Sequence, residues 1–264
     1  MSERVTYTLE GGVADVRLNR PERHNALDAE QMQAIYDVGQ TLSQRRDVRV
    51  IVLSACGPSF CSGLDFPSFQ QAGQSLDSAF QRDPGSLANH AQRVATVWRD
   101  QSVPVIAAIH GVAVGGGFQL AMGADIRIAT PDSRFCIMEI DYGLIPDMGI
   151  SQTLPPLLAY DRALELTLSG RQLDGREARA LGLVTALADD PHAQALTMAR
   201  QWAQRSPDAV RGTKALYRQS WPQATELLAE EARIQQAIMA GPNFTAAVAA
   251  KLNKQTAHFE DVDE

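Results

Sequence analysis

The order of apolar and polar residues in the first 45 positions predicts a hairpin followed by a helix. Val5–Leu9 and Gly11–Arg17 have the character of two antiparallel strands, and Gly11-Gly12 suits the turn between them. Asp28 then stands where a cap is expected for a helix that runs to about Arg45. Apolar residues recur along one side of this helix at Met32, Ile35, Tyr36, Val38 and Leu42.

Further along, short apolar segments alternate with helical ones. Val48–Ser54 is a continuous, largely β-branched run of the kind found in strands that are buried on both faces. Three more strands are expected at Val103–Ile109, Ala124–Ala129 and Arg134–Met138. Because strand and helix alternate through the first 190 residues, we predict an α/β core over residues 1–190.

Two regions depart from this alternation. Phe69–Asn89 is rich in Gln, Ser, Gly and Asp, and it is predicted to be a mobile insertion that covers a pocket. Residues 191–264 are almost wholly helical in pattern, and helices that cannot bury all their faces alone predict a region for docking or oligomerisation. The helices expected there are Pro191–Gln204, Pro207–Tyr217, Gln223–Met239 and Asn243–Gln255.

Composition narrows the class of protein. The chain has 264 residues and a formal net charge of −7, which argues against nucleic acid as a main partner. Three cysteines are too few for a disulfide scaffold, and five scattered histidines predict no metal site. No apolar run approaches the ~18 residues of a membrane span. Without an apolar signal segment near the start, a cytoplasmic location is expected.

Residues 106–125 hold the most informative segment, IAAIHGVAVGGGFQLAMGAD. An apolar strand leads into three glycines, Gly115–Gly117, and then into an apolar helix. The glycines serve either a tight turn with close packing or the close approach of a ligand to the main chain. A helix N-terminus presents free N–H groups, which suit an anion or a developing oxyanion. Nucleotide-binding motifs do not fit, because Leu120 stands where a third glycine is needed.

A second segment, residues 52–65, has the same order of strand, Gly/Pro/Ser loop and expected helix. Its loop offers another N–H group and several carbonyls. Cys61 lies in it, but no histidine stands beside this thiol in the sequence, so a small buried residue is expected rather than a nucleophile.

Four motifs in order resemble the crotonase, or enoyl-CoA hydratase/isomerase, superfamily over about residues 5–255. They are Asn19–Leu27 (NRPERHNAL), Phe60–Asp65 (FCSGLD), Gly111–Ala121 (GVAVGGGFQLA) and the stretch Glu139–Gly149. The resemblance implies a crotonase-like spiral of ββα units, a C-terminal helical trimerisation region, and a homotrimer or a dimer of trimers.

The same resemblance implies the binding site. The backbone N–H groups of Leu64 and Gly116 would form an oxyanion hole for the carbonyl of an acyl-CoA thioester, and coenzyme A would be part of the substrate, with no further cofactor. Two N–H donors aimed at that oxygen would stabilise an enolate. The residues implied to bind the substrate are Arg23, His24, Ala26, Ser62, Leu64, Asp65, Gly116 and Gln119.

The acidic positions bear on which reaction is catalysed. Gln119 stands where enoyl-CoA hydratases hold a catalytic glutamate, and an amide can only orient substrate or water. Glu139 matches the second hydratase carboxylate, and its apolar neighbours favour a raised pKa. Asp147 has two interpretations: Pro146-Asp147 resembles a helix cap, but Glu139 with Asp147 resembles the acidic pair of dienoyl-CoA isomerases.

Three hypotheses follow. The first is an enoyl- or dienoyl-CoA isomerase in which Asp147 takes a proton near the α-carbon and Glu139 delivers one further along, with exchangeable roles. The second is a hydratase that uses Glu139 and a water held by Gln119. The third is a non-catalytic acyl-CoA or protein-binding member of the fold, which the retained acidic pair disfavours.

Overall fold

The computed structural model describes residues 3–71, 81–220 and 226–257. Its main sheet has six strands in the order β1-β2-β3-β4-β6-β9, and a smaller sheet has the order β5-β7-β8. The strands of the main sheet are β1 (Val5–Glu10), β2 (Val13–Leu18), β3 (Val50–Ala55), β4 (Val105–Ile109), β6 (Ile126–Ala129) and β9 (Ala186–Leu187). Those of the smaller sheet are β5 (Val112–Val114), β7 (Arg134–Cys136) and β8 (Leu173–Asp174).

The predicted hairpin and buried strands are confirmed. β1 and β2 pair antiparallel, and both turn glycines have positive φ, +57° at Gly11 and +82° at Gly12. From β2 onward the pairs of the main sheet are parallel. β4 starts at Val105 rather than at the expected Val103, because Pro104 has no N–H to donate to the ladder and contributes only its carbonyl, which accepts from Ile51.

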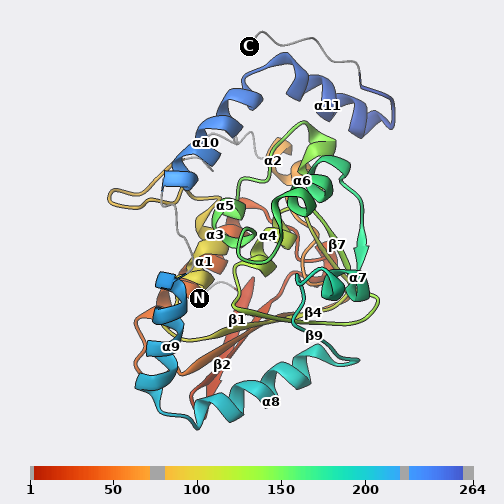
Figure 1. Cartoon of the computed structure of the whole chain (residues 1–264). Coiled ribbons are helices and arrows are strands. Elements are labelled where there is room, and N and C mark those ends of the chain that lie inside the picture. Colours follow the sequence, from red (N-terminus) through yellow and green to blue (C-terminus); the bar gives the residue numbers. More distant parts are fainter. Residues whose placement is uncertain (1–2, 72–80, 221–225, 258–264) are drawn as a thin grey trace.

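Helices cover both faces of the main sheet (Figure 1). On one face lies α8 (Pro191–Ala203), whose alanines pack on Val50, Val52 and Ile106. Because alanine has a short side chain, this helix lies close against the strands. The other face packs against α1 (Ala29–Ser43), α3 (Arg93–Arg99) and α4 (Gly116–Met122). Asp28 caps α1 as predicted, since its carboxylate accepts from the Gln31 N–H at 2.8 Å.

Short elements connect these layers. They are η1 (Pro21–Arg23), α2 (Phe66–Gln71), η3 (Glu139–Tyr142), α5 (Ile150–Thr153), α6 (Tyr160–Ser169) and α7 (Gly175–Ala180). Part of the predicted insertion, residues 72–80, lies outside the described residues. No helix in the described part of the chain is long and apolar enough to cross a bilayer.

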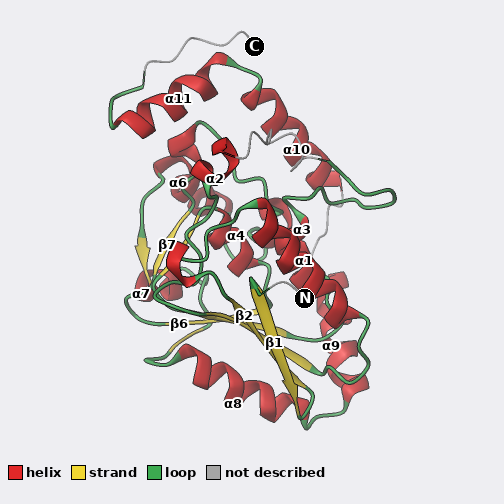
Figure 2. Cartoon of the chain, turned by 180° about the vertical axis from the view of Figure 1, so that it is seen from behind, coloured by secondary structure: helices red, strands yellow, loops and turns green. Residues whose placement is uncertain are grey.

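The last three helices are α9 (Pro207–Ser220), α10 (Glu226–Met239) and α11 (Pro242–Asn253). Residues 221–225, which include the predicted start of the third C-terminal helix, lie outside the described residues. Seen from both sides, α10 and α11 lie on the opposite side of the molecule from α8 (Figures 1 and 2). There α10 contacts α5 and α11 contacts η3, so this end of the chain returns to its own core.

The contact between α4 and the loop after β3 generates a first prediction. A Cβ atom added at Gly117 would lie 2.2 Å from the Cys61 carbonyl oxygen, so Gly117→Ala must push helix and loop apart. We expect the free energy of unfolding to fall by roughly 1–3 kcal/mol, measured by chemical denaturation. Gly212→Ala is the matched control, because that glycine of α9 has open space around it and alanine there should add roughly 0.5–1 kcal/mol. Equal effects of the two substitutions would contradict the close contact.

Candidate active site

A cavity of about 100 Å³ collects the residues that the sequence predicts to be catalytic. Leu64, Gly116, Glu139 and Asp147 all line it, although they come from four separate segments. The other lining residues are Met32, Ser62, Gly63, Phe66, Ala91, Gly115, Met138, Tyr142, Leu144, Met148, Gln235 and Met239. No lysine, arginine or histidine is among these described lining residues, so no cation balances the two carboxyl groups within the cavity wall.

The loop after β3 is held by the segment that ends at Leu27. The Leu27 N–H donates to the Gly63 carbonyl at 2.8 Å, and the Asp65 N–H donates to the Leu27 carbonyl at 3.0 Å. One step earlier, the Ser62 N–H donates to the His24 carbonyl at 3.0 Å. This parallel pairing uses the N–H groups of Ser62 and Asp65 and the carbonyl of Gly63, and it leaves the Leu64 N–H without a hydrogen-bond partner among the described residues.

The three glycines bring the start of α4 against this loop. Gly115 has a φ of +54°, which favours glycine, and it is the residue before the helix. A Cβ at Gly63 would lie 3.4 Å from the Gly116 nitrogen, so the two glycines are near neighbours. As the first residue of α4, Gly116 has no intrahelical acceptor, and its N–H has no hydrogen-bond partner in the described part of the chain. Two N–H groups therefore stay available at the cavity.

Gln119 lies behind the cavity, not in it. Its side chain is fully buried, its Nε2 donates to Glu139 Oε1 at 2.7 Å, and its Oε1 accepts from the Met148 N–H at 2.7 Å. The amide thus joins the segment of Glu139 to the segment of Asp147. Its predicted contact with substrate stays a prediction, because both functional atoms are engaged within the protein.

Glu139 begins the short helix η3 and is 9% exposed. Its Oε1 accepts from Gln119, whereas its Oε2 has no hydrogen-bond partner among the described residues. Burial raises the pKa of Glu139 to about 7, and the hydrogen bond from Gln119 opposes this rise. A carboxyl group with this pKa is half protonated near neutral pH, so it can accept or donate a proton.

Asp147 precedes α5 but does not cap it. The cap position is Gly149, and no side chain makes a cap hydrogen bond there, so the helix-cap interpretation fails. Burial raises the pKa of Asp147 well above its usual range, and the charges of Glu231 and Glu139 raise it further. Since these carboxyl groups oppose one another's ionisation, they hold protons near neutral pH that isolated carboxyl groups would release.

Helix α10 closes one side of the cavity with Gln235 and Met239. Sequence reasoning assigned this helix to oligomerisation and missed both residues. The Gln235 Oε1 accepts from the Ile145 N–H at 3.0 Å, which ties the helix to the segment that carries Asp147. The only signal in the sequence is a glutamine within an amphipathic helix. This pattern does not show which backbone group the glutamine binds.

The remaining predicted binding residues are not among those that line the cavity. Ala26 is buried, and the Arg23 side chain is half exposed. His24 Nδ1 lies 2.9 Å from Ser59 Oγ. The Asp65 carboxylate is buried and forms an ion pair with Arg20 at 2.8 Å. Its side chain therefore holds the loop together and does not line the cavity.

Cys61 is fully buried, and burial raises the pKa of its thiol to about 12. It stays a thiol at neutral pH, as expected for a packing residue and not for a nucleophile. Among the described residues no group of three or more His, Cys, Asp or Glu side chains is arranged to hold a metal ion.

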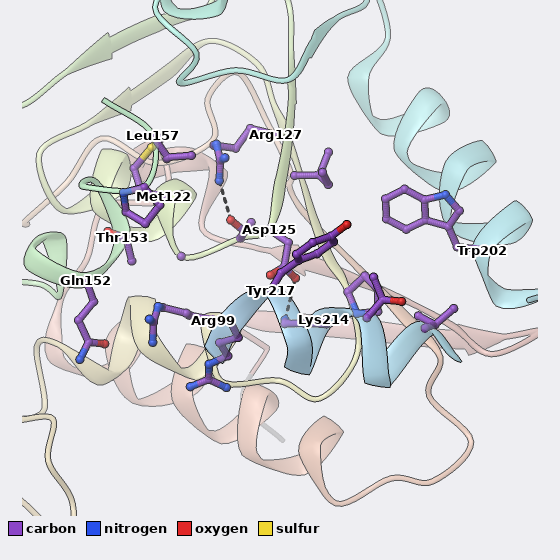
Figure 3. A pocket seen from close by; sticks show the side chains of 18 of the residues that line it. Arg99, Met122, Asp125, Arg127, Gln152, Thr153, Leu157, Trp202, Lys214 and Tyr217 are labelled. Carbon is purple, nitrogen blue, oxygen red and sulfur yellow. Dashed lines mark hydrogen bonds and ion pairs between the residues drawn. The ribbon is translucent and has the colours of Figure 1, made fainter. Parts of the chain in front are cut away.

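A larger cavity of about 710 Å³ lies elsewhere, between α9 and the N-terminal ends of β4 and β6 (Figure 3). Its lining includes Arg99, Arg127 and Trp202, but none of the predicted site residues. Asp125 is its one described carboxylate, and Lys214 binds it at 2.7 Å. The cavity thus offers no pair of carboxyl groups for proton transfer, and we place the chemistry in the smaller cavity despite its size.

Comparison with known proteins agrees with this fold. The sequence model of the enoyl-CoA hydratase/isomerase family matches residues 8–262. The chain is 32% identical to a peroxisomal Δ(3,5)-Δ(2,4)-dienoyl-CoA isomerase of Arabidopsis thaliana, over 97% of this chain and 96% of that protein. It is also 32% identical to an (E)-benzylidenesuccinyl-CoA hydratase of Thauera aromatica, over 80% of each. A crystal structure of an enoyl-CoA hydratase/isomerase from Pseudoalteromonas atlantica superposes with a TM-score of 0.82 at 28% identity, covering 97% of this chain and 100% of that one.

The chain therefore belongs to the enoyl-CoA hydratase/isomerase family, and it is an enzyme of the crotonase superfamily. The predicted α/β fold class and the family resemblance are confirmed. The relatives include both isomerases and hydratases, so family membership alone leaves the particular reaction open.

The raised pKa of Glu139 generates a prediction for stability. Its folded-state pKa of about 7 lies above the ordinary value of 4.5, so its contribution to stability is fully present below about pH 4.5 and is lost as the pH rises through 7. Glu139→Gln removes this loss of stability at higher pH, because the amide side chain stays neutral. We expect the variant to be more stable than the parent at pH 8, by up to about 3 kcal/mol, and the difference to disappear at about pH 4, below the ordinary pKa of 4.5. Urea denaturation at both pH values measures it, and a pH-independent difference would contradict the assigned burial cost.

Proposed function

We propose that the protein is a coenzyme A thioester isomerase that shifts the double bonds of an enoyl- or dienoyl-CoA. One observation carries this proposal: two carboxyl groups with raised pKa line the same small cavity as two backbone N–H groups that have no hydrogen-bond partner among the described residues. A thioester enolate needs a hydrogen-bonded oxygen and nearby groups that exchange protons with carbon. The Arabidopsis and mouse relatives named as Δ(3,5)-Δ(2,4)-dienoyl-CoA isomerases support a dienoyl-CoA as the substrate.

In the proposed mechanism, the N–H groups of Leu64 and Gly116 donate to the thioester oxygen. Each such donor is typically worth about 3–4 kcal/mol in the transition state. The Asp147 carboxylate removes a proton near the α-carbon, and the electron pair of that C–H bond passes into a dienolate. Glu139 then gives its proton to a remote carbon as the double bonds move. No atoms are gained or lost, and the proton passes back from Asp147 to Glu139 before the next turnover.

This mechanism needs one proton on the pair, not none and not two. The mutual repulsion of Glu139 and Asp147, with no described cation in the cavity wall, favours such a singly protonated state near neutral pH. The requirement is the same whichever of the two carboxyl groups acts as the base.

The alternative is hydration of a 2-enoyl-CoA. The similarity of the chain to the hydratase from Thauera aromatica supports this alternative. Hydration in this family uses two carboxyl groups around one water, and Gln119 replaces one of them. Because Gln119 is fully buried and bonded at both ends, it is poorly placed to hold a water for attack. A non-catalytic member of the fold is disfavoured by the acidic pair.

Coenzyme A is proposed to lie along Arg23, His24 and Ala26, next to the Ser62–Asp65 loop. The half-exposed Arg23 guanidinium supplies positive charge on this side of a chain with net charge −7. We propose no cofactor beyond the coenzyme A of the substrate. The homotrimer or dimer of trimers and the cytoplasmic location stay predictions.

Substrate comparison separates the two reactions. The protein is incubated with a 3,5-dienoyl-CoA and, separately, with a 2-enoyl-CoA, and ultraviolet absorbance follows conjugation. The isomerase proposal expects a growing absorbance of the conjugated 2,4-dienoyl-CoA and little loss of the enoyl-CoA signal. Turnover of the 2-enoyl-CoA alone would replace isomerisation by hydration as the function.

Asp147→Asn tests the acidic pair. The amide cannot take a proton from carbon, so we expect kcat with the dienoyl-CoA to fall by about 10²–10⁴-fold, while the fold stays intact by circular dichroism. Asp141→Asn is the matched control, since Asp141 is exposed and pairs with Lys251 away from the cavity. Unchanged turnover in Asp147→Asn would remove that residue from the mechanism.

The pH dependence of kcat/KM tests the singly protonated pair. Activity is lost on the acid side as the base becomes protonated and on the alkaline side as the acid ionises. Because the pKa of Glu139 is about 7 and that of Asp147 is raised, we expect a bell-shaped profile with its maximum near neutral pH or above. A profile that stays flat from pH 5 to pH 9 would contradict the pair.

A further inference from the structure

A third carboxylate, Glu231 of α10, lies directly behind the segment that carries Asp147. It is 5% exposed, and its two oxygens accept from two backbone N–H groups at the start of α5. The Gly149 N–H donates to Oε1 at 2.7 Å, and the Ser151 N–H donates to Oε2 at 3.1 Å. The Gln92 amide also donates to Oε1 at 3.2 Å. Burial raises the pKa of Glu231, and these three hydrogen bonds oppose the rise because they favour the ionised carboxylate.

We infer that Glu231 is a positioning residue for Asp147: its hydrogen bonds to the Gly149 and Ser151 N–H groups fix the backbone that follows Asp147, and its side chain places negative charge next to the acidic pair. This inference rests on the proposed function, because it assigns Glu231 a task in the acid–base step. Glu231 itself does not line the cavity, so it acts through Asp147 and not on the substrate.

The geometry supports a role beyond packing. Burying a carboxylate costs free energy that a simple helix contact does not require, and a leucine could fill the same space on α10. Instead, two carboxylate oxygens satisfy two N–H groups two residues apart, which sets the position of the peptide segment immediately after Asp147. The neighbouring Gln235 holds Ile145, on the other side of Asp147. Asp147 is thus held from both sides by one helix.

The charges around Asp147 point in one direction. Glu231 from α10 and Glu139 from η3 both raise the pKa of Asp147, after burial. The polar side chains that bond to the neighbouring segments, Gln92, Gln119 and Gln235, are neutral. The covering helices also carry Arg233 on α10 and Lys251 on α11, and Lys251 is paired with Asp141. Neutralising Glu231 removes one of the two negative charges that raise the pKa of Asp147.

Glu231→Gln keeps the shape of the side chain and removes its charge. With a dienoyl-CoA substrate, we expect kcat to fall by roughly ten- to a hundredfold with little change in KM, and the limb of the pH profile that belongs to Asp147 to move to lower pH. Glu231→Asp keeps the charge and should keep that limb near its original position. Two controls accompany them: Asp161→Asn removes an exposed negative charge on α6, and Gln236→Ala changes an exposed residue of α10.

A second measurement needs no catalysis. In protein labelled with ¹³C at the carboxyl groups of aspartate, the Asp147 signal, assigned with Asp147→Asn, is followed by NMR against pH. The titration should move to lower pH in Glu231→Gln and stay unchanged in both controls. A loss of stability in Glu231→Gln with an unmoved Asp147 titration would reduce Glu231 to a structural residue and overturn the inference. If the parent turns over no CoA thioester but the titration still moves, the proposed function fails and the electrostatic coupling stands.

Discussion

Close backbone contact between the start of α4 and the loop after β3 is the constraint on which the site depends. Gly117 rests on the Cys61 carbonyl at a distance that excludes any side chain, and Gly63 lies beside the Gly116 nitrogen. This contact brings two chain segments more than fifty positions apart to one point, where the N–H groups of Leu64 and Gly116 have no hydrogen-bond partner among the described residues. Backbone donors left open at a cavity are sites for a ligand oxygen.

Around these donors, three acidic side chains lie close together in a largely desolvated environment. Glu139, Asp147 and Glu231 come from η3, the segment before α5, and α10, and the described cavity wall holds no cation. Such an arrangement costs folding free energy, because desolvated carboxyl groups repel one another. The same repulsion keeps a proton on the cluster at neutral pH. Electrostatic repulsion between carboxyl groups, rather than strained backbone geometry, therefore prepares the site to move protons between carbon atoms.

Most of the fold and part of the site could be predicted from the sequence. Asp28, the alternation of strands and the glycine run all act locally, and local patterns are visible in a sequence. Leu64 was found only through family resemblance, since a main-chain donor leaves its side chain unconstrained. The sequence did not reveal Glu231 and Gln235, nor the structural role of Gln119, because each of the three binds a backbone N–H at least 29 positions away. Bonds of this kind follow no period along the chain, and only the folded arrangement shows them.

The residues that line the cavity range from Met32 to Met239, so its formation depends on contacts between distant parts of the chain. Loops of that length close late and slowly when a protein refolds. A chain that has already formed the main sheet, with α8 on one face and α1 on the other, still lacks the helix that completes the wall. Recovery of catalysis after dilution from denaturant should therefore lag behind recovery of the circular dichroism signal, which makes turnover a reporter of the final docking step.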